Sequence, residues 1–133
     1  MNRKRRKLIG FTLIELLIVM VILGLLASLV APTMFGKVAS SKQKTAKAQM
    51  QMLATAVDAF RLDTGDFPQD LKDLRQSTGE YWDGPYMPKD IPLDPWGKEY
   101  VLVVAENGIE FSLISYGKDG EPGGEGEDED VEY

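Results

Sequence analysis

Residues 10–31 read GFTLIELLIVMVILGLLASLVA, and this stretch decides the fold of the N-terminal part of the chain. From Phe11 to Ala31 it contains 21 residues, of which Glu15 alone is charged. A helix of that length, rising about 1.5 Å per residue, crosses the roughly 30 Å hydrocarbon core of a bilayer. A carboxylate within such a span costs about 2.5 to 3.5 kcal/mol. The sequence therefore predicts a membrane-spanning helix in which Glu15 needs a partner that offsets this cost.

Five basic residues and no acidic residue precede this helix, namely Arg3, Lys4, Arg5, Arg6 and Lys7. By the positive-inside rule, residues 1–10 stay in the cytoplasm and the rest of the chain faces outward. A cleaved secretory signal peptide has a similar basic and apolar pattern. This sequence has no good small-x-small cleavage site for such a peptide, because the weak candidate at residues 29–31 is followed directly by Pro32. We therefore interpret residues 11–31 as a retained span.

The segment Gly10-Phe11-Thr12-Leu13-Ile14-Glu15 after a short basic leader resembles the type III signal sequence of type IV pilins and pseudopilins. The resemblance implies cleavage between Gly10 and Phe11 by an inner-membrane prepilin peptidase, followed by N-methylation of Phe11. It also implies that Glu15 pairs with the amino terminus of a neighbouring subunit during assembly. Opposite charges in a low dielectric offset the cost that either charge alone would carry. The implied organisation is a prepilin leader peptide (1–10), a transmembrane and assembly helix (11–31) and a periplasmic domain (32–133).

Charge and composition exclude several functions. The net charge is −6, and removal of the five leader cations lowers it to −11, which disfavours contact with nucleic acid. The sequence has no cysteine and no histidine, so disulfides, a thiol nucleophile and the usual zinc ligands are unavailable. About 100 residues follow the span, which is enough for one small domain with a modest core.

The periodicity beyond the span predicts an α+β domain of the pilin-like kind. The helix is expected to continue to Gly65, with a possible bend near Pro32 and Gly36, and to bury one apolar stripe, Ala46, Met50, Leu53, Val57 and Phe60. A short helix around residues 71–74 and an ordered aromatic loop at 79–95 follow. Residues 99–105 and 109–115 are alternating runs rich in β-branched residues, and Asn107-Gly108 lies between them. This pattern predicts an antiparallel hairpin with a type I′ turn. In that register Val104 faces Phe111, Leu102 faces Leu113 and Tyr100 faces Ser115, on the side that covers the helix.

Three further segments are similar to the major pseudopilin of the type II secretion system. They are GPYMP at 84–88, PLDPWG at 92–97 and SYGKDG at 115–120. The resemblance implies a homo-oligomeric filament in the periplasm, assembled at an inner-membrane platform together with minor pseudopilins. Such a subunit has no catalytic activity.

The C-terminal end is acidic and rich in glycine. Residues 117–133 contain eight acidic residues and one lysine, a local charge of −7. By composition alone such a segment is a solvated tail. Its spacing is not that of an EF-hand, although a high density of oxygen ligands suits Ca²⁺ better than Mg²⁺.

The family resemblance implies that this end forms a loop that binds calcium. The expected ligands are the backbone carbonyl of Tyr116 and the carboxylates of Asp119, Asp128 and Asp130. The alignment leaves the second carboxylate open among Glu127, Asp128, Glu129 and Asp130.

Three alternatives remain beside the pseudopilin. A pilin of a surface fibre or of DNA uptake would share the leader, but the absence of cysteine and the charge of −11 argue against it. A monomeric, membrane-anchored, calcium-dependent binding module would need neither the leader nor Glu15. An enzyme is disfavoured because the acidic residues lie in a tail without partners that would tune them.

Overall fold

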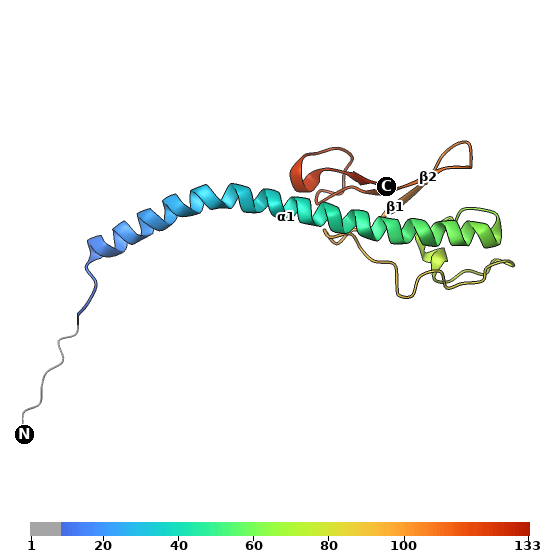
Figure 1. Cartoon of the computed structure of the whole chain (residues 1–133), viewed down its shortest axis with the longest axis horizontal. Coiled ribbons are helices and arrows are strands. Elements are labelled where there is room, and N and C mark those ends of the chain that lie inside the picture. The colour runs from blue at the N-terminus through green and yellow to red at the C-terminus, as the bar shows by residue number, and fades with distance from the viewer. Residues whose placement is uncertain (1–8) are drawn as a thin grey trace, which may run out of the picture. The chain divides into compact units, whose positions relative to one another are not determined.

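The computed structural model describes residues 9–133, and the basic residues 1–8 of the predicted leader lie outside them. Two compact units are present, one up to Gly36 and one from Lys37 to Tyr133. Helix α1, Leu13–Thr64, contributes to both units and includes Pro32 (Figure 1). It ends where the sequence predicts, because Gly65 adopts a φ of +86° and its N–H donates to the Arg61 carbonyl at 2.8 Å.

The first unit is apolar all around the helix. Its large hydrophobic side chains, from Ile14 to Phe35, are exposed because no other part of the described chain covers them. This helix is long and apolar enough to cross a membrane. Soluble proteins rarely leave a continuous apolar surface of this extent uncovered, so lipid or other helices must cover it.

The second unit has its own hydrophobic core, built on the predicted stripe of α1. All five stripe residues are buried, and Leu53 and Met50 are fully inaccessible. Leu113 from the sheet and Leu74 from the segment after α1 complete the centre of the same cluster. The 3.6-residue periodicity therefore identified the buried face of the helix correctly.

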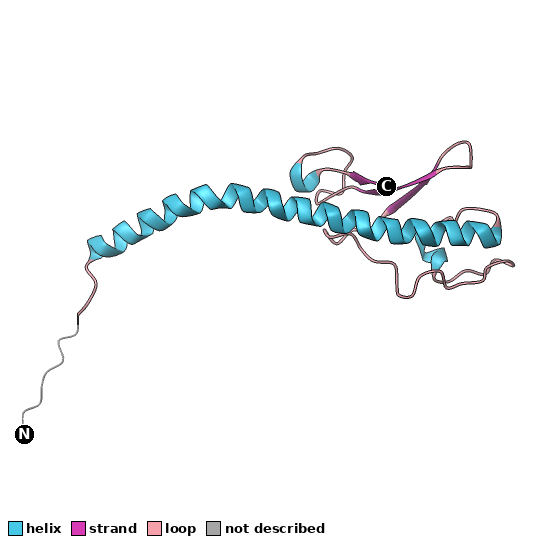
Figure 2. Ribbon diagram, in the orientation of Figure 1, coloured by secondary structure: helices cyan, strands magenta, loops and turns pink. Residues whose placement is uncertain are grey.

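A three-stranded antiparallel sheet covers this core, in the order β1-β2-β3 (Figure 2). Strand β1 is Val101–Val104, β2 is Phe111–Ser115 and β3 is Val131–Glu132. Leu102 pairs with Leu113, and Val104 pairs with Phe111, as predicted. The sheet lies against the second half of α1 through Leu113.

The predicted type I′ turn is wrong, although the register is right. Only Gly108 has a positive φ, +64°, and the hairpin closes where the Ala105 N–H donates to the Glu110 carbonyl at 2.9 Å. The loop thus has four residues, and the Asn107 side chain caps the N–H groups of Ile109 and Glu110. A two-residue and a four-residue loop centred on the same point keep the same strand pairs, so the side-chain faces were unaffected.

The chain between α1 and β1 is ordered by its aromatic side chains, as expected. It returns along α1 and includes the 3₁₀ helix η1, Leu71–Leu74 (Figure 1). Trp82 donates from Nε1 to the Asp73 carbonyl at 2.8 Å, and its ring meets that of Tyr86 edge to face at 5.8 Å. The ring of Tyr86 in turn packs against that of Phe60 on α1, with the two ring centroids 5.6 Å apart.

Strand β3 and a second 3₁₀ helix, η2 (Gly126–Asp128), were not predicted. Val131 is buried beside the core, and the Tyr133 N–H donates to the Leu113 carbonyl at 2.9 Å. The acidic end is therefore anchored to the sheet rather than forming a free tail. A two-residue strand is too short to show a periodicity in sequence.

Candidate functional sites: the N-terminal segment and the acidic loop

The N-terminus of α1 is closed by a reciprocal capping box. The Thr12 N–H donates to Glu15 Oε2 at 3.0 Å, and the Glu15 N–H donates to Thr12 Oγ1 at 3.3 Å. Sequence reasoning gave Glu15 an intermolecular role alone, whereas the structure adds a local one: its carboxylate caps its own helix. The other carboxylate oxygen, Oε1, accepts no hydrogen bond from residues 9–133.

The predicted cleavage site lies just before this cap. Gly10 and Phe11 are exposed and precede the first helical residue. A Cβ placed on Gly10 would meet no atom within 4 Å. Nothing in the fold of the described chain therefore requires glycine here.

A buried carboxylate, which sequence reasoning did not single out as functional, organises the turn before β1. Asp94 is 4% exposed, and its Oδ1 accepts from the N–H groups of Trp96 and Lys98 at 3.0 and 2.8 Å. Its Oδ2 accepts from Ser115 Oγ at 2.7 Å. All of these bonds satisfy a charge that would be costly to bury alone. The Asp-Pro-Trp-Gly segment thus joins the turn to β2, at the point where the acidic loop begins.

The acidic loop, residues 116–130, is closed by hydrogen bonds between its two sides. The Lys118 N–H donates across the loop to the Glu127 carbonyl at 2.9 Å. From outside the loop, Lys98 Nζ in the turn before β1 donates to the Lys118 carbonyl at 2.7 Å. Gly117 has a φ of +68°, and a Cβ there would lie 2.8 Å from the Glu127 carbonyl oxygen. Only glycine permits this close approach of the two sides.

Glu127 ties the loop to α1. Its Oε1 accepts from Lys42 Nζ at 2.9 Å, and its Oε2 lies 3.6 Å from Lys118 Nζ. Gln43, next along the helix, donates to the Gly126 carbonyl at 3.2 Å and to Glu129 Oε2 at 3.0 Å. The hydrogen bond from Lys42 is the main cause that lowers the pKa of the Glu127 carboxyl.

The predicted calcium ligands lie around this loop in different environments. Asp119 Oδ1 accepts from the Glu121 N–H at 3.1 Å, and Asp130 Oδ2 accepts from the Gly123 N–H at 2.9 Å. Asp130 Oδ1 is buried and has no hydrogen-bond partner. Tyr116 begins the loop, directly after β2, and Asp128 ends η2.

Some of the oxygen atoms in the loop are suitable ligands for a hard cation. Asp130 Oδ1 is a buried acceptor without a donor, which is costly unless something positive meets it. The Asp128 carbonyl oxygen lies close to the other side of the loop, because a Cβ on Gly124 would lie 2.5 Å from it. Within residues 9–133, however, no three acidic side chains are close enough to share an ion. A bound Ca²⁺ would therefore draw on backbone carbonyls as well as carboxylates.

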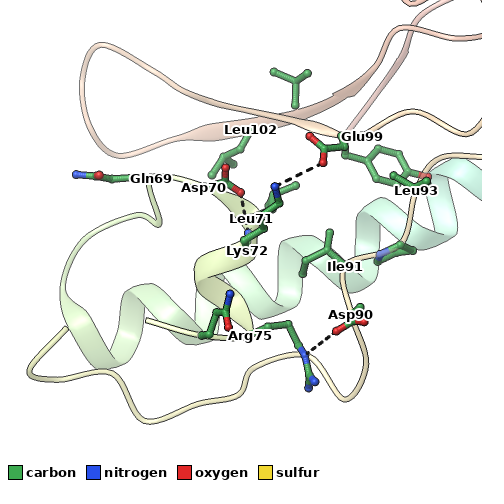
Figure 3. Close-up of a pocket in the computed structure, with 14 residues that line it drawn as sticks. Gln69, Asp70, Leu71, Lys72, Arg75, Asp90, Ile91, Leu93, Glu99 and Leu102 are labelled. Carbon is green, nitrogen blue, oxygen red and sulfur yellow. Dashed lines mark hydrogen bonds and ion pairs between the residues drawn. The ribbon is translucent and has the colours of Figure 1, made fainter. Parts of the chain in front are cut away.

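A groove of about 480 Å³ lies between η1 and the start of β1 (Figure 3). Its lining includes the apolar side chains of Leu71, Ile91 and Leu102. Its charged residues serve the fold: Asp70 caps η1, Lys72 lies 3.7 Å from Glu99, and Arg75 lies 3.8 Å from Asp90. The groove lining includes no serine, threonine, cysteine or histidine that could act as a nucleophile or base.

Comparison with known proteins identifies the family. The family model described as type II secretion system (T2SS), protein G, matches residues 33–133, and the model of the prokaryotic N-terminal methylation motif matches residues 5–31. Type II secretion system core protein G of Xanthomonas campestris pv. campestris is 42% identical over 127 residues, covering 93% of this chain and 88% of that protein. The proteins of the same name in Pseudomonas aeruginosa and Vibrio cholerae are each 35% identical, covering 96% and 97% of this chain and 96% and 93% of their own lengths.

A solved structure supports the fold. The crystal structure of the major pseudopilin from the type 2 secretion system of enterohaemorrhagic Escherichia coli matches with a TM-score of 0.60 at 24% identity. The match covers 73% of this chain and 86% of that one. The long helix, the antiparallel sheet and the family match over most of the sequence agree, and the chain belongs to the type II secretion system protein G family.

Proposed function

We propose that this chain is the structural subunit that polymerises into the periplasmic pseudopilus of a type II secretion system. Family membership carries the proposal. The uncovered apolar surface of the first unit supports it, since lipid before assembly and neighbouring helices after assembly would both bury that surface. Because the named relatives are all type II secretion proteins, a pseudopilus is favoured over a surface fibre or a DNA-uptake pilus.

Processing and anchoring follow from the N-terminal segment. The leader would be removed between Gly10 and Phe11 by a prepilin peptidase and Phe11 would be methylated, in agreement with the matching methylation motif. Residues 11–31 would hold the subunit in the inner membrane with residues 32–133 in the periplasm. Addition to the filament would then take place at the inner-membrane platform, together with minor pseudopilins.

Glu15 would form an ion pair with each new subunit as it joins the filament. Its Oε2 is committed to the cap of its own helix, which fixes the carboxylate at the start of α1. The free Oε1 would accept from the Phe11 amine of a neighbouring subunit, and the ion pair would offset the cost of both charges in the membrane. The reaction is association alone, and no bond is made or broken by this chain.

Substitution of Glu15 tests this function, and the capping box offers a matched pair of variants. Glu15→Gln keeps an oxygen that can cap Thr12 but removes the charge, whereas Glu15→Val removes both. We expect both variants to insert in the membrane and neither to form filaments, as measured by crosslinking in whole cells and by electron microscopy of the periplasmic contents of lysed cells. Normal filaments in Glu15→Gln would show that charge pairing does not admit the subunit.

Calcium in the acidic loop is the second part of the proposal. The ligands would be the Tyr116 carbonyl and the carboxylates of Asp119, Asp128 and Asp130, and these carboxylates would have to move closer together around the ion, because no three acidic side chains of residues 9–133 are near enough to share one as they stand. A bound cation would reduce the repulsion among the eight acidic residues of segment 117–133 and would hold both sides of the loop together. The buried, unpartnered Asp130 Oδ1 is the observation that favours this part.

A further inference from the structure

One face of α1 carries lysines that have no acidic partner in the described chain. Between Glu15 and Asp58 the helix has four lysines and no acidic residue. Lys42 pairs with Glu127 of the acidic loop, but Lys37 and Lys44 are exposed and form no ion pair or hydrogen bond with residues 9–133. These two positions are seven residues apart, so they lie on the same face about 10 Å from each other along the axis.

This lysine face lies away from the acidic loop of the same copy. The loop contacts α1 at Lys42 and Gln43. At about 100° per residue, Lys37 and Lys44 are about 140 to 160° around the helix from Lys42. Each copy therefore presents uncompensated positive charge on one side of α1 and strong negative charge on another, at the same height along the helix.

The acidic loop contains carboxylates that form no hydrogen bond within the described chain. Glu121 and Glu125 are exposed, their side chains accept no hydrogen bond within the described chain, and neither is among the predicted calcium ligands. The loop would remain negative with one Ca²⁺ bound, because residues 116–130 contain seven acidic residues and one lysine, and their net charge of −6 exceeds the +2 of the ion. Small residues, Ser40, Ser41 and Ala48, surround the lysines and leave room for a second surface to approach.

We propose that Lys37 and Lys44 of one copy pair with Glu121 and Glu125 in the acidic loop of the next copy. This proposal rests on the filament function proposed above. The two surfaces differ, so the contact is heterologous: each copy uses its lysine face for one neighbour and its loop for the other. A contact of this kind propagates into an open helical polymer instead of closing as a dimer. Complementary charges also set the register in which a new subunit joins.

Disulfide crosslinking tests the geometry directly, because the natural sequence has no cysteine. In cells that express the whole secretion system, the full chain with Lys44→Cys and Glu125→Cys should give a ladder of crosslinked oligomers under mild oxidation. Each single variant should give dimers at most, and the control pair Lys89→Cys with Glu125→Cys should give no ladder. A ladder from the control pair, or none from the test pair while wild-type filaments form, would overturn the proposal.

Charge reversal tests the chemistry. Lys37→Glu with Lys44→Glu should lower filament yield about tenfold, since two ion pairs are replaced by repulsion. Adding Glu121→Lys and Glu125→Lys to the same chain should restore the yield, and Lys89→Glu should have no effect. Loss without rescue would refute the pairing and would assign the lysines to another contact, such as lipid headgroups. These outcomes are distinct from failure of the filament function, in which the wild-type chain itself would form no filaments and Glu15 substitution would change nothing.

Discussion

At the residue scale, Glu127 connects α1 to the opposite side of the acidic loop. It accepts from Lys42 on α1, lies near Lys118 on the opposite side of the loop, and offers its own carbonyl to the Lys118 N–H. The Glu127 side chain is 28% exposed, so solvent weakens these ion pairs but does not remove them. The pKa of its carboxyl is lowered, chiefly by the hydrogen bond from Lys42.

This lowered pKa predicts how acid affects the loop. A carboxyl whose pKa is lower in the folded than in the unfolded protein stabilises the fold above its ordinary pKa of 4.5, and this stabilisation is lost as the pH falls through the folded value. We expect Lys42→Met to lower the free energy of unfolding of residues 37–133 at about pH 7 and to have a smaller effect at about pH 3. Urea denaturation at the two pH values measures the difference, with Lys89→Met as the control. An equal loss at both pH values would assign the effect of Lys42 to packing.

Gly10 carries the prediction for processing. Because a Cβ at this position meets no atom of the described chain, Gly10→Leu should leave the fold intact. We expect mass spectrometry of the membrane fraction to show methylated Phe11 as the first residue of the wild type and the full precursor for Gly10→Leu. A mature chain that starts after Ala31 would contradict the membrane interpretation of residues 11–31.

At the scale of elements, α1 changes its role between its two halves. Residues before Lys37 are apolar on every side and have no core of their own, whereas those after it bury one stripe. Within the stripe Leu53 is 0% exposed, and its neighbour Met52 is 56% exposed on another face. The second half therefore contributes to stability through its periodicity and not through its average hydrophobicity.

Leu53 and Met52 form a matched pair for measuring that contribution. Leu53→Ala leaves a cavity in the core and should lower the free energy of unfolding of residues 37–133 by about 2 to 5 kcal/mol. Met52→Ala should change it by about 0.5 kcal/mol or less, because the side chain is exposed in the isolated unit. Denaturation in urea compares the two. Similar losses for both would mean that the helix does not pack on the sheet through the stripe.

At the scale of the whole molecule, calcium should couple the acidic loop to the stability of the second unit. Binding to the folded state alone contributes about 2.7 kcal/mol at a hundredfold excess over Kd. For a domain of this size that raises the melting temperature by about 10 °C.

The expected result is that residues 37–133 melt about 10 °C higher in calcium than in chelator. Asp119→Ala and Asp130→Asn should each remove most of this difference, and magnesium should substitute poorly. Glu121→Gln, at an exposed acidic residue outside the predicted ligand set, should retain it. Equal melting curves in calcium and chelator would show that the loop does not bind the ion.

Local patterns in the sequence were sufficient for the helix, its buried stripe and the strand register. Each depends on residues within a few positions of one another, so the periods of 3.6 and 2 are visible without any tertiary contact. The Asn-Gly signal located the centre of the hairpin, but the turn type depended on how Asn107 capped the loop. Glu15 stood out as a lone charge in an apolar helix, although its capping bond to Thr12 was not foreseen.

The way in which the acidic end is held depends on contacts between residues far apart in the sequence. Glu127 meets Lys42 across 85 positions of sequence, and the buried Asp94 meets Ser115 across 21. No periodicity or spacing in the sequence encodes such pairs, because they exist only once the sheet has packed on α1 and brought the two segments together. The residues of α1 and of the core could be read from the amino-acid pattern alone, whereas the closed acidic loop and the pairing of β3 with β2 arise only in the folded chain. The physical reason is that secondary structure follows from local side-chain pattern, whereas the loop depends on charges and backbone groups that meet only through the packed core.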